Sequence, residues 1–257
     1  MASSSDQVVS DRVVGLRVDD AIATITLDSQ HNRNALSRQL VSELGERLDE
    51  IESSVGVRVV VLTHAGPAFC AGADLKERST GTPDSTPMVR VLERLMDSAQ
   101  PTVAAVNGAV RAGGLGLMAS CDLVVVHQAV TFAMTEVRIG VAPAIISVPI
   151  LRRVAPSKIA TSMLTGEPFD AEEARAMGLV THVTDDVDAT TSALCAGIVA
   201  GAPRAVAETK RLLHHVPALD RSTAFAQMRA LSDELFSGPD AAEGMAAFRE
   251  NRPPNWT

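Results

Sequence analysis

The chain has 257 residues, of which 46% are hydrophobic and 21% charged, enough apolar material for one compact core with a smaller appendage. Its net charge of −8 provides no basic field for nucleic acid or an anionic membrane, and an aromatic content of 3% argues against stacking on single-stranded nucleic acid. Three widely spaced cysteines indicate a reduced, cytoplasmic protein without a disulfide framework.

The N-terminal part of the chain predicts strands and one helix. The first six residues lack the regions of a signal peptide, and no apolar run nears the roughly 18 residues of a membrane-spanning helix, so we expect no membrane insertion. Residues 21–27 alternate apolar and β-branched side chains, as a strand does. Ser37 could cap a helix whose apolar positions recur at helical spacing as far as Ile51. Residues 57–63 are typical of a strand buried on both faces.

The middle of the chain alternates turns, helices and strands. Residues 64–76 are rich in turn formers, and the polar stretch 79–87 is expected to be a mobile loop. A second helix is predicted over residues 88–99, and a Gly-rich turn leads into a third that ends before Asp122. Short strands are expected at residues 102–106, 123–126 and 131–134.

From about residue 155 the β pattern fades and helices dominate. They are expected at residues 171–177, 189–200, 205–214, 223–236 and 241–249. Strands that alternate with helices, followed by helices alone, predict an α/β core over residues 1–195 and an α-helical C-terminal region over residues 196–257.

Two loops rich in small residues follow two of the predicted strands. The first, residues 69–76, comes after the strand at residues 57–63. The second, residues 106–116, follows the strand that ends at Val106. Such loops gather at the ligand crevice of an α/β sheet, and small residues leave backbone N–H groups unshielded. Two N–H groups aimed at one oxygen would form an oxyanion hole, each donor contributing roughly 3–4 kcal/mol in the transition state.

Together with residues 31–36 (HNRNAL), these loops resemble the signature segments of the crotonase (enoyl-CoA hydratase/isomerase) superfamily. The resemblance runs in order from about residue 15 to Trp256 and so covers nearly the whole chain. It implies a crotonase-like spiral of repeated ββα units with an α-helical C-terminal region that serves oligomerisation. It also implies an acyl-CoA thioester substrate, no separate cofactor because coenzyme A is part of that substrate, and a homotrimer or hexamer.

The resemblance assigns roles position by position. The oxyanion donors would be the N–H groups of Ala73 and Gly113. The residues placed near the substrate and its coenzyme are Arg33, Ala35, Ala71, Asp74, Leu75, Lys76 and Gly114. Phe248 and Arg252 resemble the terminal segment that reaches the nucleotide of a neighbouring subunit. Each motif also has an ordinary interpretation: a tight turn, a close helix contact, or a solvated lysine or arginine.

One acid–base residue stands out, and a second is missing. Hydratases of this family commonly present two glutamates, one in the Gly-rich loop and one about twenty residues later, which suits general acid–base work. Glu136 matches the second, at a strand end before an apolar stretch, where burial would raise its pKa. The position of the first falls on Gly116, which cannot move a proton.

This departure leaves three interpretations open. Glu136 could act alone as acid and base in adding water to a 2-enoyl-CoA, as in subgroups resembling branched-chain or methylglutaconyl-CoA hydratases, which residues 141–147 also resemble. It could instead shuttle a proton between Cα and Cγ in a Δ3,Δ2-enoyl-CoA isomerase. The chain could also bind acyl-CoA with little hydratase activity. We predict hydration and leave the length and branching of the acyl chain open.

Other kinds of site fit less well. Residues 114–119 match the G-x-G-x-x-A pattern of dinucleotide binding, but the predicted helix ends by Asp122, too early for a Rossmann crossover. The histidines and cysteines have no spacing suited to a metal, so none is expected. Asp122 is expected to serve a helix-to-strand turn, and Arg138 to pair with surface acids instead of a substrate carboxylate.

Overall fold

The computed structural model describes residues 12–80, 82 and 84–256. Its larger sheet has six strands in the order β1-β2-β3-β5-β7-β10. These strands are β1 (Val14–Asp19), β2 (Ile22–Leu27), β3 (Val59–His64), β5 (Thr102–Val106), β7 (Leu123–His127) and β10 (His182–Thr184). Neighbouring strands run parallel except for the antiparallel pair β1 and β2.

A smaller sheet has four short strands in the order β4-β6-β8-β9. They are β4 (Ala68–Cys70), β6 (Ala109–Arg111), β8 (Thr131–Ala133) and β9 (Phe169–Asp170). The first three run parallel, and β9 closes the sheet in the antiparallel direction.

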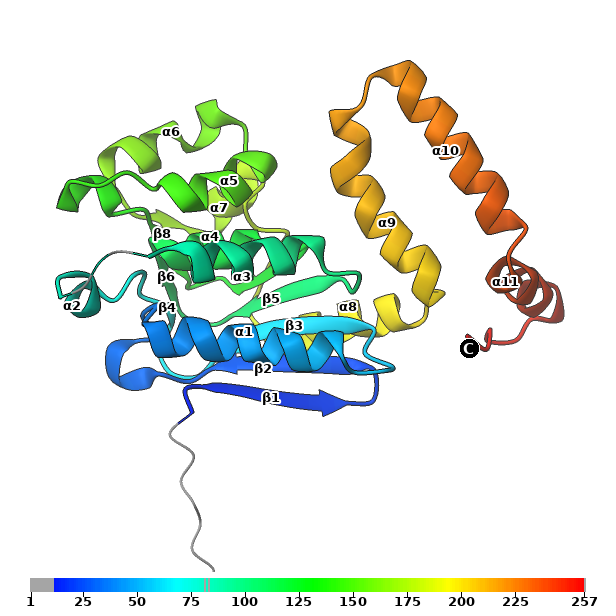
Figure 1. Ribbon diagram of the computed structural model, residues 1–257, viewed down its shortest axis with the longest axis horizontal. Coiled ribbons are helices and arrows are strands. Elements are labelled where there is room, and N and C mark those ends of the chain that lie inside the picture. Colours follow the sequence, from blue (N-terminus) through cyan, green and yellow to red (C-terminus); the bar gives the residue numbers. More distant parts are fainter. Residues whose placement is uncertain (1–11, 81, 83, 257) are drawn as a thin grey trace, which may run out of the picture.

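Helices surround and connect these two sheets (Figure 1). The α-helices are α1 (Arg38–Glu52), α2 (Leu75–Arg78), α3 (Thr86–Asp97), α4 (Gly113–Ala119), α5 (Ala144–Arg153), α6 (Pro156–Thr165), α7 (Ala171–Met177), α8 (Val187–Val199), α9 (Pro203–His215), α10 (Arg221–Phe236) and α11 (Pro239–Glu250). The 3₁₀ helices are η1 (Gln30–Asn32), η2 (Glu136–Ile139) and η3 (Val216–Ala218).

The chain advances as a repeated strand–strand–helix unit. In each repeat the first strand, β3, β5 or β7, joins the larger sheet, and the second, β4, β6 or β8, joins the smaller one. Helical structure follows each pair before the next repeat begins. The predicted α/β spiral of ββα units is therefore confirmed.

Several predicted elements are confirmed and others were missed. The strand at residues 102–106 and the helix at residues 171–177 lie where they were expected. In α1 the Ser37 side chain accepts the N–H of Leu40, as expected of an N-cap. Missed were the strands β1, β4, β6, β9 and β10 and the helices α5 and α6. The strands β9 and β10 also correct the expectation that β structure fades after residue 155.

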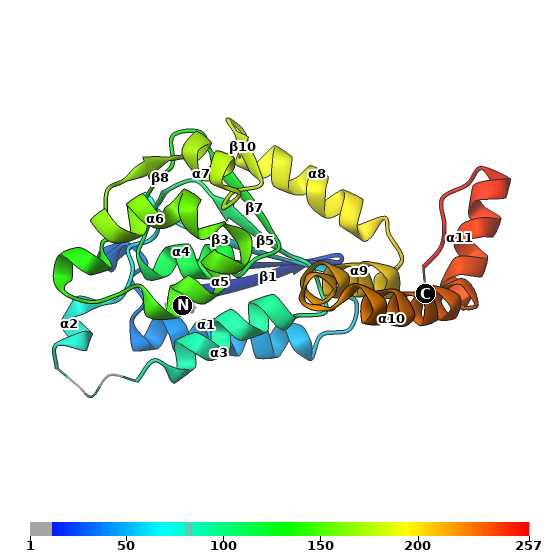
Figure 2. The same cartoon turned by 90° about the horizontal axis from the view of Figure 1, so that it is seen from above.

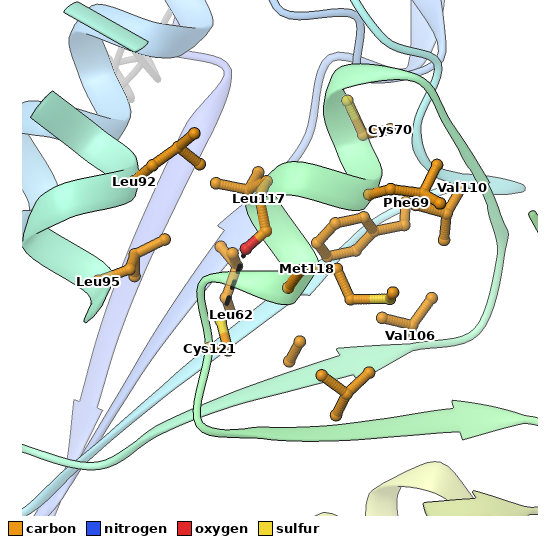
Figure 3. Packing of buried hydrophobic residues seen from close by; sticks show 14 of the residues in the cluster. Leu62, Phe69, Cys70, Leu92, Leu95, Val106, Val110, Leu117, Met118 and Cys121 are labelled. Carbon is orange, nitrogen blue, oxygen red and sulfur yellow. Dashed lines mark hydrogen bonds between the residues drawn. The ribbon is translucent and has the colours of Figure 1, made fainter. Parts of the chain in front are cut away.

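The short helix α4 lies inside the core. All its residues except Gly113 are buried: Leu117 lies toward Leu92 of α3, and Met118 lies beside Phe69 of β4 and Val106 of β5 (Figure 3). A helix that is apolar on every side has no solvent face and must be surrounded by other elements. The N-terminus of α4 is consequently held in a fixed place.

The helices α9 to α11 form a C-terminal arm (residues 203–250) that extends to one side of the core (Figure 1, Figure 2). Its only described residues that are fully buried are Lys210 and Ala247. Lys210 Nζ lies 2.9 Å from Asp122 Oδ2, an oxygen that also accepts the N–H and hydroxyl of Thr102. Asp122 therefore joins the helix-to-strand turn to α9, which confirms its predicted structural role.

None of the helices in the described ranges is long and apolar enough to cross a membrane. The polar N-terminal stretch, for which no signal peptide is expected, lies outside the described residues. Residues 81 and 83 of the predicted mobile loop also lie outside them, and α3 begins within that loop, at Thr86.

Candidate active site

The three groups expected to do the chemistry follow adjacent parallel strands. Ala73 lies three residues after β4, Gly113 two residues after β6, and Glu136 three residues after β8. Because β4, β6 and β8 are neighbours in the smaller sheet, their carboxyl ends lie at one edge (Figure 1). Functional groups of α/β proteins commonly gather at such an edge. The fold therefore brings Ala73, Gly113 and Glu136 to one side of the sheet.

The first turn (residues 71–74) is paired with the N-terminal segment that carries the third sequence landmark. The N–H of Ala71 donates to the Arg33 carbonyl at 3.1 Å, and the N–H of Leu36 donates to the Gly72 carbonyl at 2.7 Å. Ala35 is buried in this segment. These hydrogen bonds place residues 33–36 directly beside the first turn, as the predicted common site requires.

The second turn (residues 111–114) touches the first through its backbone. A Cβ added to Gly72, whose φ is +91°, would lie 2.8 Å from the Cβ of Ala112 and 3.6 Å from the nitrogen of Gly113. Only glycine fits at position 72, because a side chain would meet both the contact and the positive φ. The peptide that carries the N–H of Ala73 therefore packs against Ala112, the residue before Gly113.

Ala112 has a strained backbone, with φ +46° and ψ −120° at the N-cap of α4. Such a conformation costs a non-glycine residue about 1–3 kcal/mol and persists only where the surroundings enforce it. Its N–H donates to the carbonyl of Ala133 at 2.9 Å, which ties the second turn to the end of β8. The strain fixes the direction in which the following peptide, that of Gly113, points.

Both proposed donors are unengaged. Across the described residues, neither the N–H of Ala73 nor that of Gly113 has a protein acceptor. The first N–H groups of a helix lack an intrahelical partner, and they carry the positive end of the helix dipole. Gly113 is the first residue of α4, so its N–H is available to an external oxygen.

Gly114 seats α4 against β4. A Cβ at Gly114 would lie 2.7 Å from the Cβ of Cys70 and 3.0 Å from the Cys70 carbonyl oxygen. Burial raises the pKa of the Cys70 thiol to about 12, so this cysteine packs as an apolar group and is no nucleophile. Close packing explains Gly114 without any contact to a ligand.

Glu136 begins η2 and is half-buried. Its Oε2 atom is buried and has no hydrogen-bond partner. Burial raises the pKa of this carboxyl, an effect that the backbone N–H of Glu136 itself only partly offsets. An unsatisfied buried carboxylate oxygen is costly for folding and is typical of a group held ready to exchange a proton.

The place of the missing first glutamate is filled. A Cβ at Gly116 would lie 2.4 Å from Ile146 Cγ2 and 3.2 Å from the Ile146 Cα. Because the Ile146 backbone belongs to α5, a larger residue at 116 would force this helix away from α4. The chain therefore has no space for a carboxylate at this position.

The other residues that the sequence singled out have varied surroundings. Asp74 caps α2, since its Oδ1 accepts the N–H groups of Lys76 and Glu77. Of the residues that the sequence singled out around the first turn, those with exposed side chains are Arg33, Leu75 and Lys76. Phe248 and Arg252 lie on and after α11, on the far side of the core from the two turns (Figure 1). A single chain does not bring these last two residues to the site.

Arg138 is engaged with its own chain. Its Nε donates to the Thr165 carbonyl at 2.9 Å, and a second nitrogen pairs with Glu167 at 2.5 Å. This arrangement confirms the predicted pairing with a surface acid.

Two cavities lie away from these turns. One, of about 270 Å³, is lined by Ser120, Asp122, Arg152 and His214, and another, of about 410 Å³, by Arg12, Thr26, Asp28 and Arg47. Neither is lined by Ala73, Gly113 or Glu136. Among the residues with described positions, no group of three or more His, Cys, Asp or Glu could hold a metal ion.

Comparison with known proteins adds an independent finding. The chain matches the enoyl-CoA hydratase/isomerase family over residues 17–257. A solved enoyl-CoA hydratase from Mycobacterium smegmatis has a TM-score of 0.90 and 30% identity, covering 96% of this chain and 99% of that one. One from Mycobacterium avium is 38% identical, with a TM-score of 0.73 and coverage of 96% and 100%. The mevalonyl-coenzyme A hydratase sidH of Aspergillus fumigatus is 32% identical over 248 residues, 91% of each chain.

Proposed function

The chain belongs to the enoyl-CoA hydratase/isomerase family, and from that membership we propose that it adds water to the double bond of a 2-enoyl-CoA thioester. The N–H groups of Ala73 and Gly113 would polarise the thioester carbonyl, and Glu136 would be the one group that moves protons.

The observation that carries this proposal is the buried, unpartnered Oε2 of Glu136 at the same sheet edge as two unengaged amides. A raised pKa brings a carboxyl closer to the pH at which it can both take and return a proton. Pre-positioned amides stabilise the negative charge that develops on the thioester oxygen. Acid–base and electrostatic catalysis are therefore both available at this edge.

In the proposed reaction the Glu136 carboxylate removes a proton from water while the oxygen attacks Cβ of the enoyl group. The electron pair of the double bond moves to Cα and the carbonyl oxygen, where the two N–H groups stabilise the enolate. Glu136 then returns its proton to Cα, so that water is added across the double bond and the carboxylate is restored. One carboxylate serves both steps, which favours addition of the hydroxyl group and the proton to the same face of the double bond.

Isomerisation is the second candidate, and the contact between Gly116 and Ile146 favours it. With no space for another carboxylate, Glu136 has no partner to activate water separately. A single carboxylate suffices to move a proton between Cα and Cγ of a 3-enoyl-CoA. The two reactions differ in whether water is consumed, not in the oxyanion stabilisation they need.

The deciding experiment assays the wild-type protein with crotonyl-CoA, a 3-enoyl-CoA and methylglutaconyl-CoA. We expect hydration, with Glu136→Gln lowering kcat about 10²- to 10⁴-fold while acyl-CoA affinity changes less than about threefold. Glu172→Gln, at an exposed carboxylate of α7, is the matched control and should leave kcat unchanged. Turnover of the 3-enoyl substrate alone would establish the isomerase.

A third outcome is acyl-CoA binding without turnover of any substrate, which would make the chain a binding homologue. The same conclusion would follow if the protein turned over substrate only slowly and Glu136→Gln did not change that rate. The coenzyme contacts proposed for Arg33, Ala71 and Lys76 are tested separately, by the affinity of coenzyme A for their alanine variants.

We also infer a homotrimer or hexamer. The support is the exposed apolar surface of the arm, where Phe225, Phe236 and Phe248 are 72%, 70% and 87% exposed. Exposed apolar patches of this kind commonly mark protein interfaces. A second copy is also what Phe248 and Arg252 would need in order to approach a nucleotide. Analytical ultracentrifugation measures the assembly directly.

A further inference from the structure

His64, the last residue of β3, lies between the backbone segments that lead to the two turns. Its Nε2 accepts the N–H of Asn107 at 3.0 Å, and its ring packs edge-on against Phe69, with ring centroids 5.7 Å apart. Phe69 belongs to β4, which leads to the first turn, whereas Asn107 precedes β6, which leads to the second. One side chain therefore contacts both approaches to the site.

The contact around His64 is tight. A Cβ at Gly108 would lie 2.8 Å from His64 Cε1 and 2.6 Å from the Pro67 carbonyl oxygen. The N–H of Ala109 donates to the same Pro67 carbonyl at 3.2 Å. Since Gly108 has no side chain, the turn after β5 can close onto the imidazole, which brings the N–H of Asn107 within hydrogen-bond distance of Nε2.

The pairing of β4 with β6 is irregular. Ala68 pairs with Ala109 and Cys70 with Val110, so the register shifts within three residues. A bulge of this kind places two residues of one strand opposite one of the other and weakens the ladder locally. Contacts beside the ladder therefore contribute to fixing the position of the first turn relative to the second.

The protonation state of His64 allows its imidazole to accept a hydrogen bond. Burial lowers the pKa of His64, and the backbone of Ala65, Gly66 and Ala68 offsets only part of that shift. Because Nε2 accepts the N–H of Asn107, it carries no proton, and the uncharged ring has its proton on Nδ1. Protonated histidine could not accept the N–H of Asn107.

We propose that His64 is a positioning residue, which holds the register between the two turns by accepting the N–H of Asn107 and so keeps the amides of Ala73 and Gly113 aimed at one oxygen. This inference rests on the proposed function, because it assigns the two amides a common ligand. His64 touches no reacting atom in this scheme. It acts through the β4–β6 pair, whose far end is the contact between Gly72 and Ala112.

Three variants separate this role from simple packing. His64→Gln keeps an acceptor at the reach of Nε2, His64→Asn carries one only at the reach of Nδ1, and His64→Leu has none. The Gln and Asn variants are both neutral and polar, so they remain comparable even if the Leu variant fails to fold. Circular dichroism and thermal unfolding establish that each variant is folded.

Two measurements report on register. One is the exchange rate of the Asn107 amide in the protein without ligand. The other is the ¹³C chemical shift of the thioester carbonyl in bound [1-¹³C]butyryl-CoA, a saturated probe that cannot react. We expect His64→Gln to keep the slow exchange and the shift. In His64→Asn and His64→Leu, exchange should quicken at least 10-fold and at least half of the carbonyl shift should be lost.

Turnover gives the third readout. Displacing a catalytic group by about 1 Å can cost about 10²-fold in rate. We expect kcat to fall 10- to 100-fold in His64→Asn and His64→Leu with KM within threefold, and to stay within threefold in His64→Gln. A loss shared equally by Gln and Asn would overturn the role assigned to the Nε2 acceptor.

The remaining outcomes distinguish this inference from the function on which it rests. If the wild-type protein leaves the butyryl-CoA carbonyl unshifted, the oxyanion assignment fails and the positioning role fails with it. If the wild-type shift is normal and all three variants retain it, only the role of His64 is overturned. Slow Asn107 exchange in every variant would likewise overturn it, because the hydrogen bond would then not depend on residue 64.

Discussion

The helices α4 and α10 show how differently two parts of this molecule obtain their structure. The seven residues of α4 are all buried except Gly113, whereas none of the 16 residues of α10 is buried. The short helix is fixed by contacts on every side, and it can therefore hold an amide in place. The long one is stabilised within the chain mainly by its own hydrogen bonds, so its apolar side chains remain available to another surface.

The largest expected difference between core and arm concerns two phenylalanines. Phe132 is fully buried and stacks on Phe169, with ring centroids 5.3 Å apart, whereas Phe236 of α10 is 70% exposed. In the unassembled chain, Phe132→Ala should lower the free energy of unfolding by about 3–5 kcal/mol, and Phe236→Ala by less than about 0.5 kcal/mol. Urea denaturation at a protein concentration low enough to dissociate the subunits measures both. A comparable loss in the two variants there would mean that residues of the same chain cover the surface of α10.

The contact between α9 and the core provides the next test of this comparison. Lys210 is 5% exposed and donates to the carbonyls of Leu95 and Gln100 besides pairing with Asp122. Lys210→Met leaves those acceptors buried without a donor, and we expect a loss of about 3 kcal/mol with faster proteolysis in α9. Arg229→Met breaks the exposed pair with Asp233 in α10 and should cost less than about 0.5 kcal/mol. An unaltered proteolysis pattern would show that α9 is held by other contacts.

Two helical glycines provide a smaller contrast. Gly116→Ala places a methyl group against Ile146 and should lower the free energy of unfolding by about 1–3 kcal/mol. Gly197→Ala in α8, where a Cβ meets nothing within 4 Å, should raise it by about 0.5–1 kcal/mol. Thermal and urea unfolding of both variants measure these two changes in the free energy of unfolding, which should have opposite signs. Stabilisation by Gly116→Ala would refute the account of the missing glutamate.

The smallest expected effect is the pH dependence that Glu136 imposes on stability. Because burial raises the pKa of this carboxyl, the folded protein binds its proton more tightly than the unfolded chain does. The free energy of unfolding contributed by Glu136 therefore falls as pH rises above about 4.5 and levels off above the raised pKa. Relative to the wild type, Glu136→Gln should therefore gain stability as pH rises from about 4.5 to the raised pKa. A constant difference across this range would contradict the raised pKa.

Much of the fold could be predicted from periodicity. Apolar positions at helical spacing located α1, and the short apolar run within residues 57–63 located β3. The strands β4, β6 and β9 have only two or three residues, too few for any period to be visible. The helix α5 contains Pro149 and several β-branched residues, which hid it from the same reasoning.

The site was predictable in its parts but not in its packing. Small residues pointed to Ala73 and Gly113, and the position of Glu136 after a strand pointed to its burial. Nothing in the sequence indicated that Ile146 occupies the space beside Gly116, or that Ala112 adopts a strained backbone, because both depend on contacts between distant segments. His64 looked like one more turn residue, since its partner Asn107 lies 43 positions along the chain.

The order of the smaller sheet has a consequence for how the protein is made. The strands β4, β6 and β8 are neighbours in space in the order in which the ribosome produces them. A nascent chain can therefore lay each repeat onto the one before, without waiting for a distant C-terminal strand to insert between them. The first turn, the second turn and Glu136 are completed in that sequence, so synthesis of the arm begins only after the chemical groups have already been translated.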